Sequence, residues 1–196
     1  NFKEIPSSCF LLIENDLIKN LKLIEKVRIE AGVEIICALK GFSMWSTFSL
    51  LKKYLSGATA SSLHEAILIN EEMGNKAHTY CPVYLPKDFE ELIGLSLHLT
   101  FNTLTEFERY KDKIKNHQDK LSVGIRINPQ YSEIKTDLYN PAIPLSRLGE
   151  TIDRFDEKLP EGIDGLHMHV LCEQDSHVLE RVLTKAEERF SHLFKQ

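Results

Sequence analysis

Lys40 stands at the end of an apolar run that is typical of a buried strand. It follows Ile35-Ile-Cys-Ala-Leu, and Gly41 comes directly after it. A lysine in this position is costly to bury unless its amine is paired, exposed or used covalently. One interpretation is an amine that reaches solvent at the rim of a sheet. The other is a Schiff-base lysine, whose amine becomes nucleophilic when it is desolvated beside other cations.

A second group of reactive residue types lies in Gly165-Leu-His-Met-His169, which is followed by Cys172 and Glu173. Because side chains alternate between the two faces of a strand, His167 and His169 lie on the same face. Imidazole, thiolate and carboxylate groups all bind metals, but this spacing is not that of a zinc site, so we predict no metal. A core histidine is an equally good interpretation of His167. His169 lies nearer the carboxyl end of the strand and is the better candidate for a site residue.

Two arginines complete the set of candidates. Arg126 lies inside the apolar run 123–128 and needs a partner, either a structural carboxylate or an anionic group of a ligand. Arg147 comes near the end of a long irregular stretch, 129–149, that carries three prolines. It is as well placed to bind a carboxylate or cross a subunit interface as to face solvent. Loops of this length inside a compact domain are often functional.

The elements that position these residues follow from the hydrophobic pattern. It predicts strands over 34–39, 56–60, 78–83, 97–101, 121–128 and 165–170, and a further strand over 9–13. Helical periods are predicted over 16–30, 46–55, 61–73, 87–95, 105–115 and 176–194.

Strands and helices that alternate without hairpin turns form β-α units on a parallel sheet. Such a series suits either a doubly wound sheet or an incomplete (β/α)8 barrel, and no G-x-G-x-x-G motif supports the dinucleotide-binding form of the first. In a barrel, Lys40, Arg126 and His169 would all lie toward the carboxyl ends of strands, where barrel enzymes carry out their chemistry.

Composition narrows the class of protein. The 24 Lys and Arg against 29 Asp and Glu give a net charge of −5, which argues against a nucleic-acid-binding protein. The apolar runs are far shorter than the roughly 20 residues that cross a membrane, and no secretory leader is visible. The four cysteines are scattered without a C-x-x-C pair, as is typical of free thiols in a reducing cytosol. We therefore expect a soluble cytoplasmic protein without nucleic-acid or membrane partners.

Four motifs occur in order along the chain: Ala38-Leu-Lys-Gly-Phe-Ser-Met-Trp45, Gly57-Ala-Thr-Ala-Ser-Ser-Leu-His-Glu65, Ser146-Arg-Leu-Gly149 and Gly165-Leu-His-Met-His-Val-Leu-Cys-Glu-Gln174. Over nearly its whole length the sequence resembles the carboxynorspermidine (carboxyspermidine) decarboxylases, which are pyridoxal-phosphate enzymes of polyamine synthesis. These enzymes belong with the alanine racemase-like, fold type III decarboxylases. The first and last motifs point to this branch rather than to the ornithine or diaminopimelate decarboxylases.

The resemblance implies a cofactor and the residues that hold it. Pyridoxal 5'-phosphate would be bound covalently by Lys40, the catalytic residue. His169 would stack on the pyridine ring, and Arg126 matches an arginine found near the cofactor in relatives. Cys172 occupies the position of a serine that contacts the cofactor phosphate in the related decarboxylases.

Two further residues have roles that the resemblance implies at the substrate or at a subunit interface. Arg147 stands where ornithine-type enzymes carry a lysine in Ser-Lys-Phe-Gly. Glu173 belongs to the Leu-Cys-Glu-Gln motif of this branch. The implied reaction is decarboxylation of carboxynorspermidine or carboxyspermidine to norspermidine or spermidine. The alternatives are another fold type III decarboxylase, acting on ornithine, arginine or diaminopimelate, and a non-catalytic chain that binds the cofactor.

The resemblance also implies a domain organisation. Residues 1–33 would form a strand and a helix that lead into the barrel, and residues 34–196 would form the N-terminal six β-α units of a (β/α)8 barrel. The phosphate loop after the seventh strand and the C-terminal β domain of the family are absent from this sequence. We therefore expect either a part of a longer homodimeric enzyme or a truncated product, which in both cases is inactive by itself.

Overall fold

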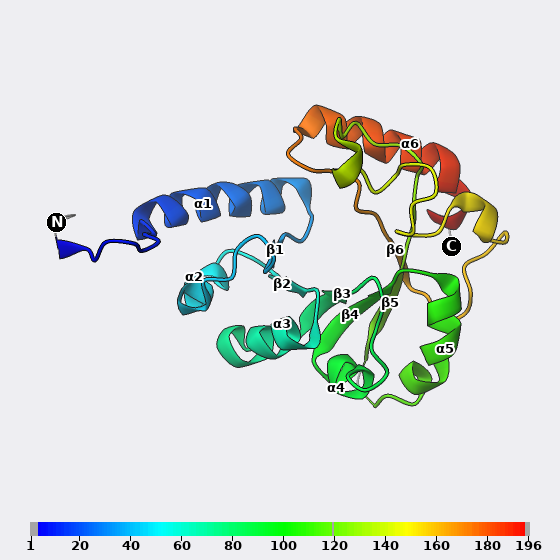
Figure 1. Cartoon of the computed structure of the whole chain (residues 1–196), viewed down its shortest axis with the longest axis horizontal. Helices are drawn as coiled ribbons and strands as arrows, with labels where there is room; N and C mark the ends of the chain where they lie inside the picture. The colour runs from blue at the N-terminus through cyan, green and yellow to red at the C-terminus, as the bar shows by residue number, and fades with distance from the viewer. Residues whose placement is uncertain (1–3, 119, 195–196) are drawn as a thin grey trace.

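The computed structural model describes residues 4–118 and 120–194, and its centre is one curved parallel sheet (Figure 1). The strands are β1 (Ile36–Ala38), β2 (Gly57–Ala60), β3 (Ala77–Tyr80), β4 (Ser96–Phe101), β5 (Ser122–Arg126) and β6 (Gly165–His167). Each strand pairs in parallel with the next in the chain, so the order is β1-β2-β3-β4-β5-β6. A doubly wound sheet reverses its strand order at a switch point. The sequential order therefore identifies a partial (β/α)8 barrel, and the six predicted strands are confirmed.

Helices follow the strands around the outer side of this sheet. The elements are α1 (Glu14–Ala31), η2 (Trp45–Thr47), α2 (Phe48–Leu51), α3 (Leu63–Leu68), the π-helical η3 (Ile69–Met73), α4 (Phe89–Gly94), α5 (Leu104–Lys115), η4 (Asp137–Tyr139), η5 (Ile152–Arg154) and α6 (Ser176–Phe194). In Figure 1, α2 to α5 succeed one another around the sheet and α6 continues the ring beyond β6. Within the described part of the chain, no helix is long and apolar enough to span a membrane.

The boundaries of α3 show how local signals position these elements. The Ser62 hydroxyl accepts a hydrogen bond from the Glu65 N–H at 3.2 Å, and the Glu65 carboxylate accepts one from the Ser61 N–H at 2.6 Å. These bonds satisfy backbone donors that the first helical turn leaves free. Gly74 ends the helical stretch in the left-handed conformation, with φ of 67°. The helical period predicted over 61–73 is thus confirmed, although its second half is π-helical.

The two faces of the sheet differ in polarity. Residues pointing outward are buried against the helices and form the main hydrophobic core, among them Ala58, Leu99, Phe101, Val123 and Ile125. Residues pointing inward are mostly polar and surround a cavity. Barrel interiors are usually filled by branched apolar side chains. A polar interior therefore marks the inner face as the place to look for a binding site.

The prediction of a strand over 9–13 is wrong. These residues run without regular structure into α1, which begins at Glu14. Phe10 is fully exposed, and Leu11 and Ile13 are half exposed. An apolar run becomes a strand only if a neighbouring strand accepts its hydrogen bonds, and no described strand pairs with this one. The division into 1–33 and 34–196 stays a prediction.

Candidate active site

A polar cavity of about 430 Å³ lies on the inner face of the sheet. All six strands contribute to its lining, and on β1 and β4 the lining residues alternate, as the period of two along a strand requires. Toward the carboxyl ends the lining includes Lys40, Ser61, Tyr80, Thr100, His167 and His169, and deeper in the barrel it includes His78, His98 and Ser122. No aspartate or glutamate is among the described residues that line it. Among these described lining residues Lys40 is the charged side chain and the others are neutral, an environment that suits an anion.

Arg126 is buried at the end of β5, with 4% of its surface exposed. Its Nη1 donates a hydrogen bond to the Tyr80 hydroxyl, and its Nη2 donates one to the His169 carbonyl oxygen at 3.0 Å. The guanidinium carbon also lies 5.1 Å from the centre of the Tyr80 ring. None of these partners is a carboxylate, so within residues 4–118 and 120–194 the charge of Arg126 has no ion-pair partner. Of the two interpretations from sequence, this favours the arginine that awaits an anionic ligand.

His167 stacks on Tyr80, with ring centroids 5.1 Å apart and planes inclined by 18°. Its Nε2 is buried and has no hydrogen-bond partner in the described part of the chain. Burial, and then the charges of Arg126, His169 and Lys40, lower the pKa of His167 to about 4. The imidazole is therefore neutral near pH 7, and its Nε2 is free to bond to a ligand.

His169 follows β6 instead of lying within it, because the strand ends at His167, earlier than the predicted 170. Its side chain lines the same cavity as Lys40 and is exposed. Partial burial and the charges of Lys40 and Arg126 lower the pKa of His169. The structure thus brings Lys40, Arg126 and His169 together at one mouth of the barrel, as the strand-end argument predicts.

The other predicted site residues lie apart from the lining of the cavity. Cys172 and Glu173 are exposed on the segment that leads to α6, and Glu173 has a left-handed backbone with φ of 52°. The Arg147 side chain is exposed as well. Its backbone carbonyl, in contrast, accepts a hydrogen bond at 2.8 Å from the amide of Asn102, a residue at the end of β4. The roles of these three side chains stay predictions.

Sequence reasoning did not identify Tyr80 or Asn102, which contact the site residues directly. A tyrosine near the end of an apolar run, as in 78–83, is common in strands and carries no signal by itself. Asn102 directly follows β4 and is only 6% exposed. The signal that could have identified Asn102 as a site residue is its position directly after the carboxyl end of a buried strand. Within the described residues, no group of three or more His, Cys, Asp and Glu is arranged to hold a metal ion.

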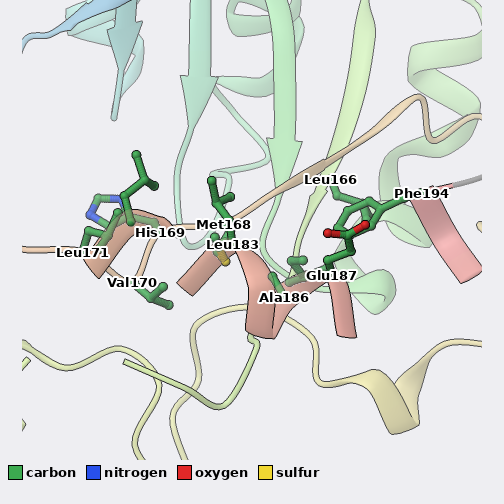
Figure 2. Close-up of a pocket in the computed structure, with 11 residues that line it drawn as sticks. Leu166, Met168, His169, Val170, Leu171, Leu183, Ala186, Glu187 and Phe194 are labelled. Atoms are coloured by element: carbon green, nitrogen blue, oxygen red, sulfur yellow. The ribbon is translucent and has the colours of Figure 1, made fainter. Parts of the chain in front are cut away.

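A second hollow, of about 660 Å³, lies between α6 and the chain after β5 and β6 (Figure 2). It is lined largely by apolar side chains, including Met168, Leu171, Leu183 and Phe194. Apart from His169 and Glu187 it offers no titratable group. The smaller polar cavity is lined by Lys40, by four histidines and by Tyr80, which contacts Arg126, and it is therefore the candidate active site.

A pH dependence of stability follows from two half-buried histidines, His78 and His167. His78 stacks on His98 at a centroid distance of 4.3 Å, and burial followed by the charge of His98 lowers the pKa of His78 to about 4. The unfolded chain binds these protons near pH 6.5, whereas folded His78 and His167 bind them only near pH 4. The free energy of unfolding should therefore be constant above pH 6.5 and fall toward pH 4, by up to about 1.4 kcal/mol per pH unit for each group.

Urea unfolding of the native protein at pH 7.5, 5.5 and 4.5 measures this dependence. His78→Gln should remove the His78 contribution and leave a shallower fall that is due to His167, while the same change at the exposed His64 should leave the full fall in stability. An equal fall in stability for the His78→Gln variant would contradict the assignment.

The chain is similar in sequence to several curated decarboxylases. It is 43% identical over 192 residues to the carboxyaminopropylagmatine decarboxylase of Synechocystis sp., covering 98% of this chain and 49% of that protein. It is 35% identical over 189 residues to the carboxynorspermidine/carboxyspermidine decarboxylase of Campylobacter jejuni, covering 96% of this chain and 48% of that protein. The chain thus spans about half the length of these curated relatives. None of the protein-family models matches it.

Solved structures agree with these relatives. The crystal structure of carboxynorspermidine decarboxylase from Campylobacter jejuni, complexed with norspermidine, superposes with a TM-score of 0.84 at 34% identity, covering 95% of this chain and 47% of that one. Diaminopimelate decarboxylase from Helicobacter pylori shares the fold, with a TM-score of 0.78 at 19% identity over 100% of this chain and 53% of that one. Over nearly all of its length, this chain is therefore similar to the carboxyaminopropylagmatine and carboxynorspermidine/carboxyspermidine decarboxylases, and its six β-α units superpose on part of the carboxynorspermidine decarboxylase structure.

Proposed function

We propose that the native protein decarboxylates carboxynorspermidine or carboxyspermidine, with norspermidine or spermidine as the product. The observation that carries the proposal is that Lys40 and His169 line one polar cavity while Arg126 is hydrogen-bonded to the His169 carbonyl beside it, in a chain with these relatives. Two further expectations belong to the proposal. The native protein should be a homodimer, which sedimentation equilibrium measures, and it should reside in the cytoplasm, which fractionation of cells measures.

Pyridoxal 5'-phosphate is the cofactor that this proposal requires, and the residues of the cavity fit it. Arg126 is a buried cation with no carboxylate partner, and the Nε2 of His167 is buried without a bond, in each case among the described residues. On the cavity face of β6, a Cβ added to Gly165 would meet no atom within 4 Å, so the floor there is open. When bound, the pyridine ring of this cofactor accepts the electron pair released as a carboxylate leaves an α-carbon.

The chain's own residues divide the remaining work. Lys40 supplies the amine that would hold the cofactor covalently, just after the end of β1, where the residue is exposed. His169 presents a neutral ring that would keep the cofactor in one plane. Arg126 contributes a permanent positive charge for an anionic group of cofactor or substrate, and His167 offers Nε2 as a hydrogen-bonding group.

A second substrate deserves equal testing because the relative that is 43% identical is named for carboxyaminopropylagmatine. Carboxynorspermidine and carboxyspermidine differ by one methylene, which a pocket distinguishes by only about 1–3 kcal/mol. A guanidino terminus, as in an agmatine derivative, differs in size, shape and hydrogen bonding, so we expect a sharper preference between this substrate and the two triamines.

Carbon dioxide release by the native protein, supplied with pyridoxal 5'-phosphate, tests the function. We expect release from one of the three carboxylated polyamines, with kcat/KM at least about a hundredfold above that for ornithine, arginine or diaminopimelate. A preference for one of these three amino acids would identify another fold type III decarboxylase instead. Cofactor binding without release from any of the six compounds would identify a non-catalytic chain.

A further inference from the structure

Tyr80, at the end of β3, touches the candidate site through both its ring and its hydroxyl. The hydroxyl accepts a hydrogen bond from Arg126 and donates one to Oδ1 of Asn102 at 3.0 Å. The ring stacks on His167 and lies beneath the guanidinium of Arg126. Tyr80 is therefore in contact with two of the residues that face a ligand, although neither contact was expected from sequence.

Asn102 continues this chain of contacts to the long loop between β5 and β6. Its Nδ2 donates to the Arg147 carbonyl at 2.8 Å, and its Oδ1 also accepts the Gly149 N–H at 3.0 Å. Oδ1 thus has two donors, the Tyr80 hydroxyl and the Gly149 amide. If the Asn102 side-chain amide were flipped, its NH2 group would face the Tyr80 hydroxyl and the Gly149 N–H. The loop backbone therefore determines the orientation of this amide.

We propose that Tyr80 and Asn102 are positioning residues that hold the Arg126 guanidinium between the Tyr80 hydroxyl and the His169 carbonyl, beside the cavity, and make its placement depend on the backbone at Arg147–Gly149. The identity of the ligand that Arg126 binds rests on the proposed function. The hydrogen bonds that position Arg126 do not depend on that function. An arginine side chain has many rotamers, and a site gains affinity when these are restricted before the ligand arrives. The alternative is that Asn102 only fastens the loop and that Tyr80 only fills space.

Two variants separate these possibilities. Tyr80→Phe keeps the ring that stacks on His167 and removes only the hydroxyl between Arg126 and Asn102. Asn102→Ala removes the bonds to the loop and the partner of the Tyr80 hydroxyl. Ser132→Ala is the matched control. The Ser132 hydroxyl donates a hydrogen bond to the Val170 carbonyl at 2.8 Å and so fastens the same loop, but it does not contact the hydrogen-bond network of Tyr80, Asn102 and Arg126.

The first measurement is the dissociation constant of pyridoxal 5'-phosphate from the native protein, followed by its visible absorption. Tyr80→Phe and Asn102→Ala should each weaken binding by roughly tenfold and shift the absorption of the bound cofactor. The double variant should bind no more weakly than either single variant, because one network is broken in every case. Ser132→Ala should leave affinity and absorption unchanged. Losses that multiply in the double variant, or an unchanged Tyr80→Phe protein, would overturn the proposal.

The second measurement needs no cofactor and separates this proposal from the proposed function. Nitrogen-15 NMR reports the rotation of the Arg126 guanidinium about its Nε–Cζ bond, which hydrogen bonds from both Nη atoms slow. Tyr80→Phe and Asn102→Ala should speed this rotation, whereas Ser132→Ala should not. If the native protein binds no pyridoxal 5'-phosphate, the proposed function fails, and the NMR result alone then supports or overturns the positioning role. Unchanged rotation in Tyr80→Phe would overturn it.

Discussion

Lys40→Ala should abolish decarboxylation, with a fall in kcat of about a thousandfold or more, because no other lysine lines the described cavity. Borohydride reduction of the protein loaded with pyridoxal 5'-phosphate should attach a pyridoxyl group to Lys40, and peptide mass spectrometry locates that label. The variant should fold normally, since the Lys40 side chain is exposed and its loss leaves no buried group without a partner.

The matched control is Lys53→Ala, which removes an exposed lysine from the turn after α2. It should retain both the label on Lys40 and the activity. A label on a different lysine, or full activity of Lys40→Ala with carboxynorspermidine, would remove Lys40 from the catalytic role. Far-UV circular dichroism of each variant establishes that the comparison is made between folded proteins.

Gly149→Ala should both destabilise the fold and disturb the candidate site. Gly149 has φ of 84°, in the left-handed region that residues with a Cβ rarely adopt. An added Cβ would lie 2.9 Å from the Ile127 carbonyl carbon and 3.0 Å from Cγ of Arg126. The backbone strain and the overpacking together should lower the free energy of unfolding by about 2–4 kcal/mol, measured by urea denaturation.

In Gly149→Ala the added Cβ would also displace the aliphatic part of the Arg126 side chain, so the substitution should affect binding of the cofactor as well. Affinity for pyridoxal 5'-phosphate should fall together with stability. Gly94→Ala is the control, because Gly94 lies in α4 with no atom within 4 Å of an added Cβ and without a positive φ. It should leave binding unchanged and raise stability slightly, since alanine favours helix. Equal stability of the two variants would contradict the close approach at Gly149.

Some elements of the chain are determined by local signals, and others depend on residues elsewhere in the chain. The helical period over 61–73 could be predicted because Ser62 and Gly74 terminate it through short-range bonds and backbone conformation. The run over 9–13 carries the same kind of local signal for a strand, yet it forms none. A strand depends on a neighbour elsewhere in the chain, and its own sequence does not contain that neighbour.

By itself, the sequence determined the alternation of strands and helices, the strand-end positions of Lys40, Arg126 and His169, and the resemblance that suggests a decarboxylase. Hydrophobic periodicity and capping act over a few residues, so they can be read directly from the chain. Only the tertiary structure decided that the strands follow one another around a barrel, that Cys172 and Glu173 are not among the described residues lining the cavity, and that Arg126 is held by Tyr80, which is 46 positions away. Those contacts depend on register between distant strands, and no pattern within a single strand specifies its partner.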